Sequence, residues 1–442
     1  MIGMSFMEHL ATAQSDAEFA RTAAGFTLLQ IYDSVKTNGV TSFQLDAIEK
    51  VEHDLAGLDL APKVRAALEA MICAIPFWES DGPIRVGRKA TYTSLLMYGD
   101  ALGSEGEWRL AENVFALAGM DTELDGETWL SAESRLLMGR AARMCADWDT
   151  AQVAYHRAAQ LGKEAGDCSI VFRAQIGEAN ILWSRGNLQT AQLRLDSIAR
   201  RAKQSCPSVV PRVTLALAGV ANMTGEYEKA ISVAFGILDT VDDDDELRYQ
   251  TLVDLASFLT DYGLPSVASN ALRLVQRSAP DRHVRRHATL NLLFLASHHE
   301  DSAEFDALRT ALADERLTTR QQAQFALFTA QGWHRFGRLA EARVAAEKAV
   351  QLANKYQHFQ LVFEAEAELS DILRTLERAP HAAAASHSLP RHSMTLAVSE
   401  DVTPNPSTAA VAINSLPPGI RRVVESLATM ASDSDLAMSV AG

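Results

Sequence analysis

Alanines recur at a nearly constant interval through the middle of this chain, and this recurrence constrains the fold more than any other feature. Each marks the start of a helix-like segment, and successive members are 35 to 40 residues apart. In most copies a small residue precedes the alanine by twelve positions and an apolar residue follows it by seven. The alanines are Ala111, Ala151, Ala191, Ala230, Ala268, Ala303 and Ala342.

The segment from Gly139 to Ala158 shows the repeating unit most clearly. Ala151, Tyr155 and Ala158 stand at positions i, i+4 and i+7, which places them on one face of a helix. The preceding run, residues 131–146, has the pattern of a second helix. Such a pair cannot bury its apolar face alone, so the copies must stack. The spacing therefore predicts an all-α protein, a solenoid of stacked antiparallel helix pairs.

The turn between the two helices also recurs, and it carries a resemblance to a known family. Together with Gly99 and Gly139 on the first helices, the turns resemble the tetratricopeptide repeat over about Arg88 to Arg378. The resemblance implies a right-handed α-solenoid. The period of most copies exceeds the family's usual length of about 34 residues, so each helix is expected to be about one turn longer. The turns are Gly106-Glu107-Trp108, Ala146-Asp147-Trp148, Gly186-Asn187-Leu188, Gly225-Glu226-Tyr227 and Gly337-Arg338-Leu339.

The chain is expected to have three parts. Residues 1–87 form an N-terminal helical cap, or alternatively a separate functional domain, and residues 88–378 form a solenoid of about seven helix pairs. Residues 379–442 form a disordered tail rich in Ala, Ser and Pro. Helix start and stop signals in the cap predict helices over about 17–36, 42–55 and 62–75.

A short amphipathic segment at residues 419–431 interrupts the tail. Val423, Val424, Leu427 and Met430 there can form one apolar face. The segment is either a nascent helix in a mobile tail or a tethered ligand that docks on another surface.

Charge and motif content argue against several classes of function. The formal net charge is −15, with 41 Lys+Arg against 56 Asp+Glu, which opposes binding to nucleic acid or to an anionic membrane. The chain contains no phosphate-binding loop, zinc-protease motif, nucleophile elbow or dinucleotide fingerprint. His283 and His287 have the spacing of metal ligands, but the neighbouring arginines oppose a cation. We therefore expect no enzyme activity, no catalytic residue, no cofactor and no metal.

The four cysteines, at positions 73, 145, 168 and 206, form no C-x-x-C pair. They are interpreted as small buried residues of a protein in a reducing compartment. No N-terminal signal sequence and no apolar run long enough to span a bilayer is present. The chain is therefore expected to be cytoplasmic.

The resemblance also implies where a ligand would bind. In tetratricopeptide-like repeats, positions 2, 5, 9 and 12 of each first helix line a concave groove. Arginine forks bind carboxylates through two hydrogen bonds, and asparagine amides can hold a peptide backbone. In the alternative interpretation, the arginines pair with acidic neighbours such as Glu133 and only solubilise the surface. The candidate peptide-binding residues are Arg140, Arg143, Arg173, Asn180, Trp183, Arg212 and Asn222.

The favoured hypothesis is a non-enzymatic scaffold or adaptor that binds an extended, acidic peptide segment of a partner protein in this groove. The alternative, which the resemblance implies, is a sensory or regulatory module of the kind found in bacterial signalling. It would respond to a signal peptide or a small molecule and control a separate output protein. Neither hypothesis involves nucleic acid or a membrane as a partner.

Overall fold

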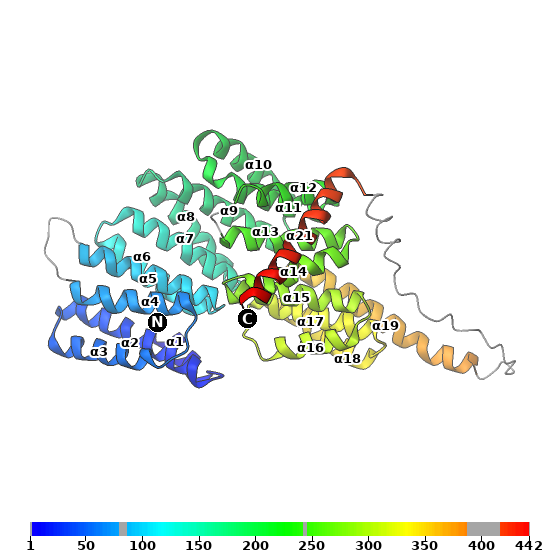
Figure 1. Cartoon of the computed structure of the whole chain (residues 1–442), viewed down its shortest axis with the longest axis horizontal. Helices are drawn as coiled ribbons and strands as arrows, with labels where there is room; N and C mark the ends of the chain where they lie inside the picture. Colours follow the sequence, from blue (N-terminus) through cyan, green and yellow to red (C-terminus); the bar gives the residue numbers. More distant parts are fainter. Residues whose placement is uncertain (1, 79–85, 242–244, 387–415, 442) are drawn as a thin grey trace. The chain divides into compact units, whose positions relative to one another are not determined.

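The computed structural model describes the chain except for residues 1, 79–85, 242–244, 387–415 and 442 (Figure 1). Every regular element in the described residues is a helix. The all-α fold and the stacking of antiparallel helix pairs are confirmed. No helix in this described part is both long enough and apolar enough to cross a lipid bilayer.

Four helices precede the repeats; the sequence signals predicted the last three, within about two residues at each end, and did not predict the first. Ser15 caps the second of these helices by accepting a hydrogen bond from the Glu18 N–H, and Gly39 ends it at a φ of 76°. Pro62 occupies the first turn of the fourth helix, where its missing N–H costs nothing. The elements are α1 (Ile2–Ala11), α2 (Asp16–Asn38), α3 (Ser42–Ala56) and α4 (Pro62–Ala74), followed by the 3-10 helix η1 (Ile75–Phe77).

The helices that follow alternate between a first and a second helix of each pair. The first helices are α5 (Val86–Ser104), α7 (Thr128–Met144), α9 (Cys168–Ser184), α11 (Val210–Met223), α13 (Asp245–Asp261), α15 (Arg282–His298) and α17 (Thr319–Arg335). The second helices are α6 (Trp108–Leu124), α8 (Trp148–Glu164), α10 (Leu188–Ser205), α12 (Tyr227–Leu238), α14 (Pro265–Ser278), α16 (Ser302–Ala313) and α18 (Leu339–Lys355). The 3-10 helix η2 (Pro207–Val209) precedes α11, and α19 (Phe359–Ser386) and α21 (Pro418–Ala441) complete the fold.

Six of the seven predicted alanines lie at the buried start of a second helix. In two copies, the small residue twelve positions earlier is a glycine, Gly99 or Gly139, and it makes room for an aromatic ring from that helix. A β-carbon on Gly139, for example, would lie 2.7 Å from the Tyr155 ring, so a larger residue there would push α7 and α8 apart. The six alanines are fully inaccessible to solvent: Ala111, Ala151, Ala191, Ala230, Ala268 and Ala342.

The prediction of Ala303 as the seventh buried anchor is wrong, because this residue is exposed. The buried residue at this point is Phe305, which is 1 % exposed and follows the helix-capping residue Asp301 by four positions. Ala151 has the same relation to its cap Asp147. A phenylalanine fits there because its ring occupies the space that a side chain on Gly332 of α17 would take. With Phe305 as the anchor, the last two intervals are both 37 residues.

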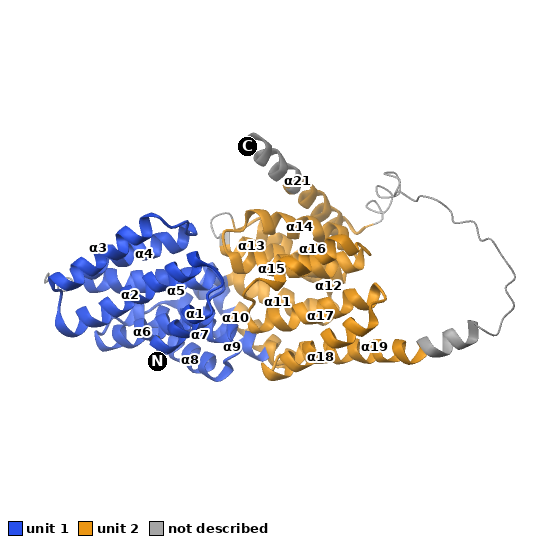
Figure 2. Cartoon of the chain, turned by 90° about the horizontal axis from the view of Figure 1, so that it is seen from below, with its two compact units in different colours: residues 1–182, 200–209 blue, residues 183–199, 210–442 orange. Residues whose placement is uncertain are grey.

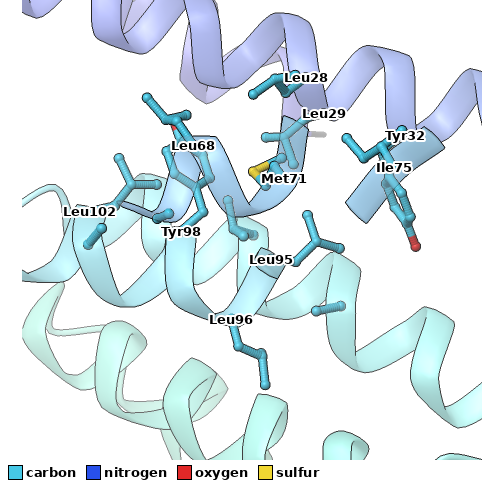
Figure 3. Packing of buried hydrophobic residues seen from close by; sticks show 14 of the residues in the cluster. Leu28, Leu29, Tyr32, Leu68, Met71, Ile75, Leu95, Leu96, Tyr98 and Leu102 are labelled. Atoms are coloured by element: carbon cyan, nitrogen blue, oxygen red, sulfur yellow. The ribbon is translucent and has the colours of Figure 1, made fainter. Parts of the chain in front are cut away.

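The chain forms two compact units (Figure 2). Unit 1 comprises residues 1–182 and 200–209, and unit 2 comprises residues 183–199 and 210–442. In unit 1, Leu28 and Tyr32 of α2 pack with Leu68 of α4 and with Leu95 and Tyr98 of α5 (Figure 3). The four N-terminal helices thus share one apolar core with the first repeats. The division into cap, solenoid and tail stays a prediction.

In unit 2, α21 packs against the second helices α12 and α14. Its Ile420, Val423 and Leu427 are at most 2 % exposed and belong to the same apolar cluster as residues of α12 and α14. The segment at residues 419–431, for which a short helix was expected, lies within α21. Residues 387–415 of the expected tail lie outside the described residues.

Three of the four cysteines depart from the expectation of buried, unpaired thiols. Cys168 at the start of α9 and Cys206 just after α10 form a disulfide, with their α-carbons 6.0 Å apart. Cys73 is unpaired and exposed. The pairing was missed because the two residues are 38 positions apart, a distance that matches no local motif but equals about one repeat.

Candidate functional site

The first helices carry the candidate binding surface, which we call the first-helix surface and define by positions 2, 5, 9 and 12 of each first helix. The residues at position 5 are apolar and buried, and those around them are mostly polar and half-buried. Within each unit, buried apolar residues flanked by polar groups offer a ligand both apolar contact area and directional contacts. The buried residues at position 5 are Leu136, Ile176, Leu215, Val253 and Leu327.

In unit 1, two of the predicted arginines lie on α7 beside aromatic rings. The Arg140 guanidinium lies 5.4 Å from the centre of the Trp108 ring, a cation–π contact. The Arg143 Nε donates to the Tyr155 hydroxyl at 3.4 Å. The Tyr155 ring in turn fills the space left by Gly139 on α7 and by Gly177 on α9. The side chain of Tyr155 therefore packs between the first helices α7 and α9 and also accepts a hydrogen bond from Arg143.

The third arginine of unit 1 pairs with a carboxylate, as the alternative interpretation proposed. Arg173 on α9 donates to Glu133 on α7, with an Nη1–Oε1 distance of 3.2 Å. The two side chains are 31 % and 16 % exposed, so the pair is only partly shielded from water. Asn180, two turns further along α9, is half-buried. The positive charge of Arg173 is therefore largely compensated within the chain.

In unit 2, the structure brings predicted residues of successive repeats together. The Trp183 ring lies over Gly219, 3.7 Å from where a β-carbon would be. Arg212 is half-buried near the start of α11. The Asn222 Nδ2 donates to the Asp261 carboxylate at 2.6 Å, while the Asn222 Oδ1 is buried without a hydrogen-bond partner among the described residues. Burial raises the pKa of Asp261, and the Asn222 hydrogen bond opposes this effect.

Three further polar residues of unit 2 were not predicted. Burial raises the pKa of Asp254 on α13 to about 7, although a hydrogen bond from Gln250 and the charge of Arg320 favour its ionised form. Burial also lowers the pKa of His287 on α15 to about 4, and the Arg320 charge adds to this shift. The charge of Arg320 thus affects the pKa values of residues on two other first helices, α13 and α15.

One of the missed residues, His287, follows from the misplaced anchor. With Phe305 in place of Ala303, the repeat numbering puts His287 at position 2 of its first helix. Gln250 occupies position 2 of the preceding first helix, and Asp254 lies one turn beyond it. The buried phenylalanine four residues after Asp301 was the available signal.

Comparison with known proteins identifies the architecture. No family model matches the chain, and no curated protein matches it. Among solved structures, the Rap conjugation gene regulator of plasmid pLS20 in complex with the Phr* peptide is similar, with a TM-score of 0.53 and 14 % identity. This match covers 76 % of the chain and 96 % of that protein.

Two further solved structures have lower scores. A Rap protein complexed with competence and sporulation factor has a TM-score of 0.45 at 13 % identity, covering 80 % of this chain and 99 % of that one. The apo quorum sensor NprR from B. thuringiensis has a TM-score of 0.37 at 10 % identity, covering 84 % and 92 %. The pLS20 match agrees with the repeat geometry described above. The chain therefore has the fold of the tetratricopeptide-like helical repeat proteins.

Proposed function

We propose that this chain is a non-enzymatic regulator that binds an extended, acidic peptide segment on its first-helix surface. The observation that carries the proposal is that, within each unit, buried apolar residues at position 5 are flanked by arginines and amides. Arginine and amide groups of this kind pair with peptide carboxylates and backbone groups. The similar fold of a regulator solved with a bound peptide supports the same proposal.

The contacts within unit 1 indicate which arginines to test. Arg173 already neutralises Glu133, and reversing its charge would place two carboxylates side by side. Arg140 has a cation–π contact with Trp108, and Arg143 has a hydrogen bond to the Tyr155 hydroxyl. Removing the charge of these two residues should weaken a peptide's carboxylate contacts without creating a repulsion inside the protein.

The experiment measures the binding of fluorescent acidic, neutral and basic octapeptide pools to the full chain by fluorescence anisotropy. Acidic pools should bind best, and the double variant Arg140→Gln/Arg143→Gln should weaken that binding at least about tenfold, because one charge-assisted hydrogen bond is worth roughly 1.5–3 kcal/mol. The matched control is Arg343→Gln on the second helix α18, where Arg343 pairs with Glu347 at 2.8 Å. Equal loss in the control, or none in the double variant, would reject the proposed surface.

The ligand has two candidate sources, a segment of a partner protein or a free signal peptide. The second is favoured by the pLS20 regulator, whose structure contains the Phr* peptide. Thermal-shift measurements with short synthetic peptides and metabolites separate them. Stabilisation by free peptides indicates a sensor that controls a separate output protein, whereas binding only to the intact partner indicates a scaffold.

A further inference from the structure

The helix α21 packs in unit 2 against the second helices α12 and α14 (Figure 1). Four apolar side chains of α21 stand at positions i, i+3, i+4 and i+7, and none of them is more than 7 % exposed. They are Ile420, Val423, Val424 and Leu427. α21 is therefore bound as an amphipathic helix, through one apolar face.

The outer positions of α12 differ from those of the other repeats. Ile231 and Phe235 follow the anchor Ala230 by one and five positions, and both belong to the apolar cluster that contains the four α21 side chains. On the six other second helices these two positions hold polar or charged residues, apart from Ala116 on α6. Apolar residues there are therefore specific to α12, against which α21 packs. We call this surface, with the adjoining side of α14, the α12–α14 face.

With α21 in place, apolar side chains of α12 and α14 are still only half-buried. Val233 of α12, together with Val267 and Leu274 of α14, packs on the same apolar cluster and keeps part of its surface accessible to solvent. Removing apolar surface from water is the main driving force of most protein association. A helix with longer apolar side chains than those of α21 can therefore gain contacts that α21 does not make.

The length of chain before α21 decides which occupants can compete with it. Residues 387–417 join α19 to α21, and a chain of this length extends to roughly 100 Å at most. A ligand joined in this way competes as if it were free at an effective concentration on the order of millimolar or below. A second copy of this chain at micromolar concentration offers only the same helix and cannot prevail. A partner helix that makes additional contacts can.

We propose that the α12–α14 face is a docking site for an amphipathic helix of a partner protein, and that α21 is a built-in competitor for this site. The partner helix carries aliphatic side chains at the spacing of Ile420, Val423, Val424 and Leu427, and it displaces α21 when it binds. While the partner is absent, α21 keeps the apolar residues of the face from water. The proposal does not depend on ligand binding by the first helices, and its tests do not measure it.

The first experiment uses a fluorescent synthetic helix that keeps the four apolar residues of α21 at their spacing and has Gln, Glu or Lys at the exposed positions. Fluorescence anisotropy with the full chain should show at least about tenfold tighter binding to Leu427→Asp than to wild type, because the added charge detaches the competing α21. The control Glu425→Ala, on the exposed side of α21, should match the wild type. Equal affinity for Leu427→Asp and wild type, or binding to neither, would overturn the proposal.

The second experiment uses the wild-type chain, so it does not depend on whether a variant folds. Hydrogen exchange of the full chain is measured with and without the same helix, unlabelled and at a roughly millimolar concentration. Exchange should rise in α21 and stay slow in α12, because the added helix replaces α21 on the face. A helix of the same composition, with its apolar residues spread around its circumference, should change neither.

Two outcomes would contradict the assignment of the face to a partner helix. Continued protection of α21 in the presence of the synthetic helix would show that α21 is not displaced. Light scattering provides the other check: a dimer of Leu427→Asp that does not bind the synthetic helix would assign the α12–α14 face to a second copy of the chain.

Discussion

The two compact units build the same helix pair with different side chains. In unit 1, the anchor Ala151 is small and the ring of Tyr155, one turn later, fills the space over Gly139. At α16 of unit 2, the anchor itself is Phe305, and the space for its ring is provided by Gly332 on α17, the first helix of the next pair. In both units, an aromatic ring near the start of a second helix fills the space beside a glycine of a first helix. The position of the aromatic residue in the repeat differs between the two copies.

The two units also attach their terminal helices by different chemistry. In unit 1, α1 contributes His9 to a buried polar cluster. In unit 2, α21 contributes an apolar face that packs on α12 and α14. Ile231 and Phe235 of α12 are buried in that cluster, whereas Gln152 and His156 hold the corresponding, exposed positions of α8. The outer face of a repeat is thus apolar where another helix covers it.

The largest expected effect tests the anchor of α16. Phe305→Ala should lower the free energy of unfolding by about 3–5 kcal/mol, because it leaves a ring-sized cavity beside Gly332. Ala303→Ser is the control and should change it by less than about 0.5 kcal/mol, since Ala303 is exposed. Urea denaturation of both variants measures the difference. Equal losses would mean that Ala303 is the anchor after all.

The next effect should be confined to unit 1, which contains all four cysteines. Cys206→Ser should lower the stability of unit 1 by about 2–4 kcal/mol, because the disulfide closes a loop of about 38 residues. The control is Cys73→Ser at an exposed, unpaired cysteine. Hydrogen exchange resolved by unit provides the measurement. A loss of protection in unit 2 alone would contradict this division.

A smaller effect is expected at the apolar attachment in unit 2. Leu427→Asp places a charge in the contact between α21 and the repeats, and should detach α21 at a cost of about 1–3 kcal/mol. Hydrogen exchange should then rise in α21 and α12. Glu425→Ala, on the exposed side of α21, should leave exchange unchanged. Continued protection of α21 in Leu427→Asp would show that the apolar face does not hold it.

The last effect concerns how pH changes the contribution of two titratable groups of unit 2 to stability. The pKa of Asp254 is raised to about 7 in the folded state, above its unfolded value of about 3.9, so its contribution to stability is lost as the pH rises from about 4 to 7. The pKa of His287 is lowered to about 4, so its contribution is lost as the pH falls from about 6.5 to 4.

The two groups therefore act in opposite directions between pH 4 and 6.5. Asp254→Asn should gain up to about 4 kcal/mol relative to wild type above pH 7, since the amide carries no buried charge, and nothing below about pH 4. Denaturation midpoints from pH 4 to 8 provide the measurement. A gain that is the same at every pH would exclude ionisation of Asp254 as its cause.

Much of the fold could be predicted from the sequence, because its signals are local. Helix caps such as Gly39, and small residues twelve positions before an anchor, act within one helix or one turn. The prediction failed where a residue of another type took an expected position, as Phe305 did. It also failed for Cys168 and Cys206, whose pairing depends on how two helices pack.

The candidate surface could be predicted only in part. The repeat numbering places Glu133 and Arg173 one repeat apart, and the same holds for Asn222 and Asp261. Residues one repeat apart lie side by side on neighbouring first helices, so such pairs were possible on spacing alone. Whether they form depends on side-chain conformations and burial, which the repeat numbering does not contain.

The sequence alone determined that this chain is a stack of helix pairs. Small and apolar residues that recur at a regular interval can all be buried when the helix pairs stack on one another. The tertiary structure decided which charges are compensated, which cysteines pair and which outer face α21 covers. Those outcomes depend on contacts between residues tens to about a hundred positions apart, such as His9 with Glu107. Ion pairs and docked helices depend on distance and shielding from water, and both are set only when the chain is folded.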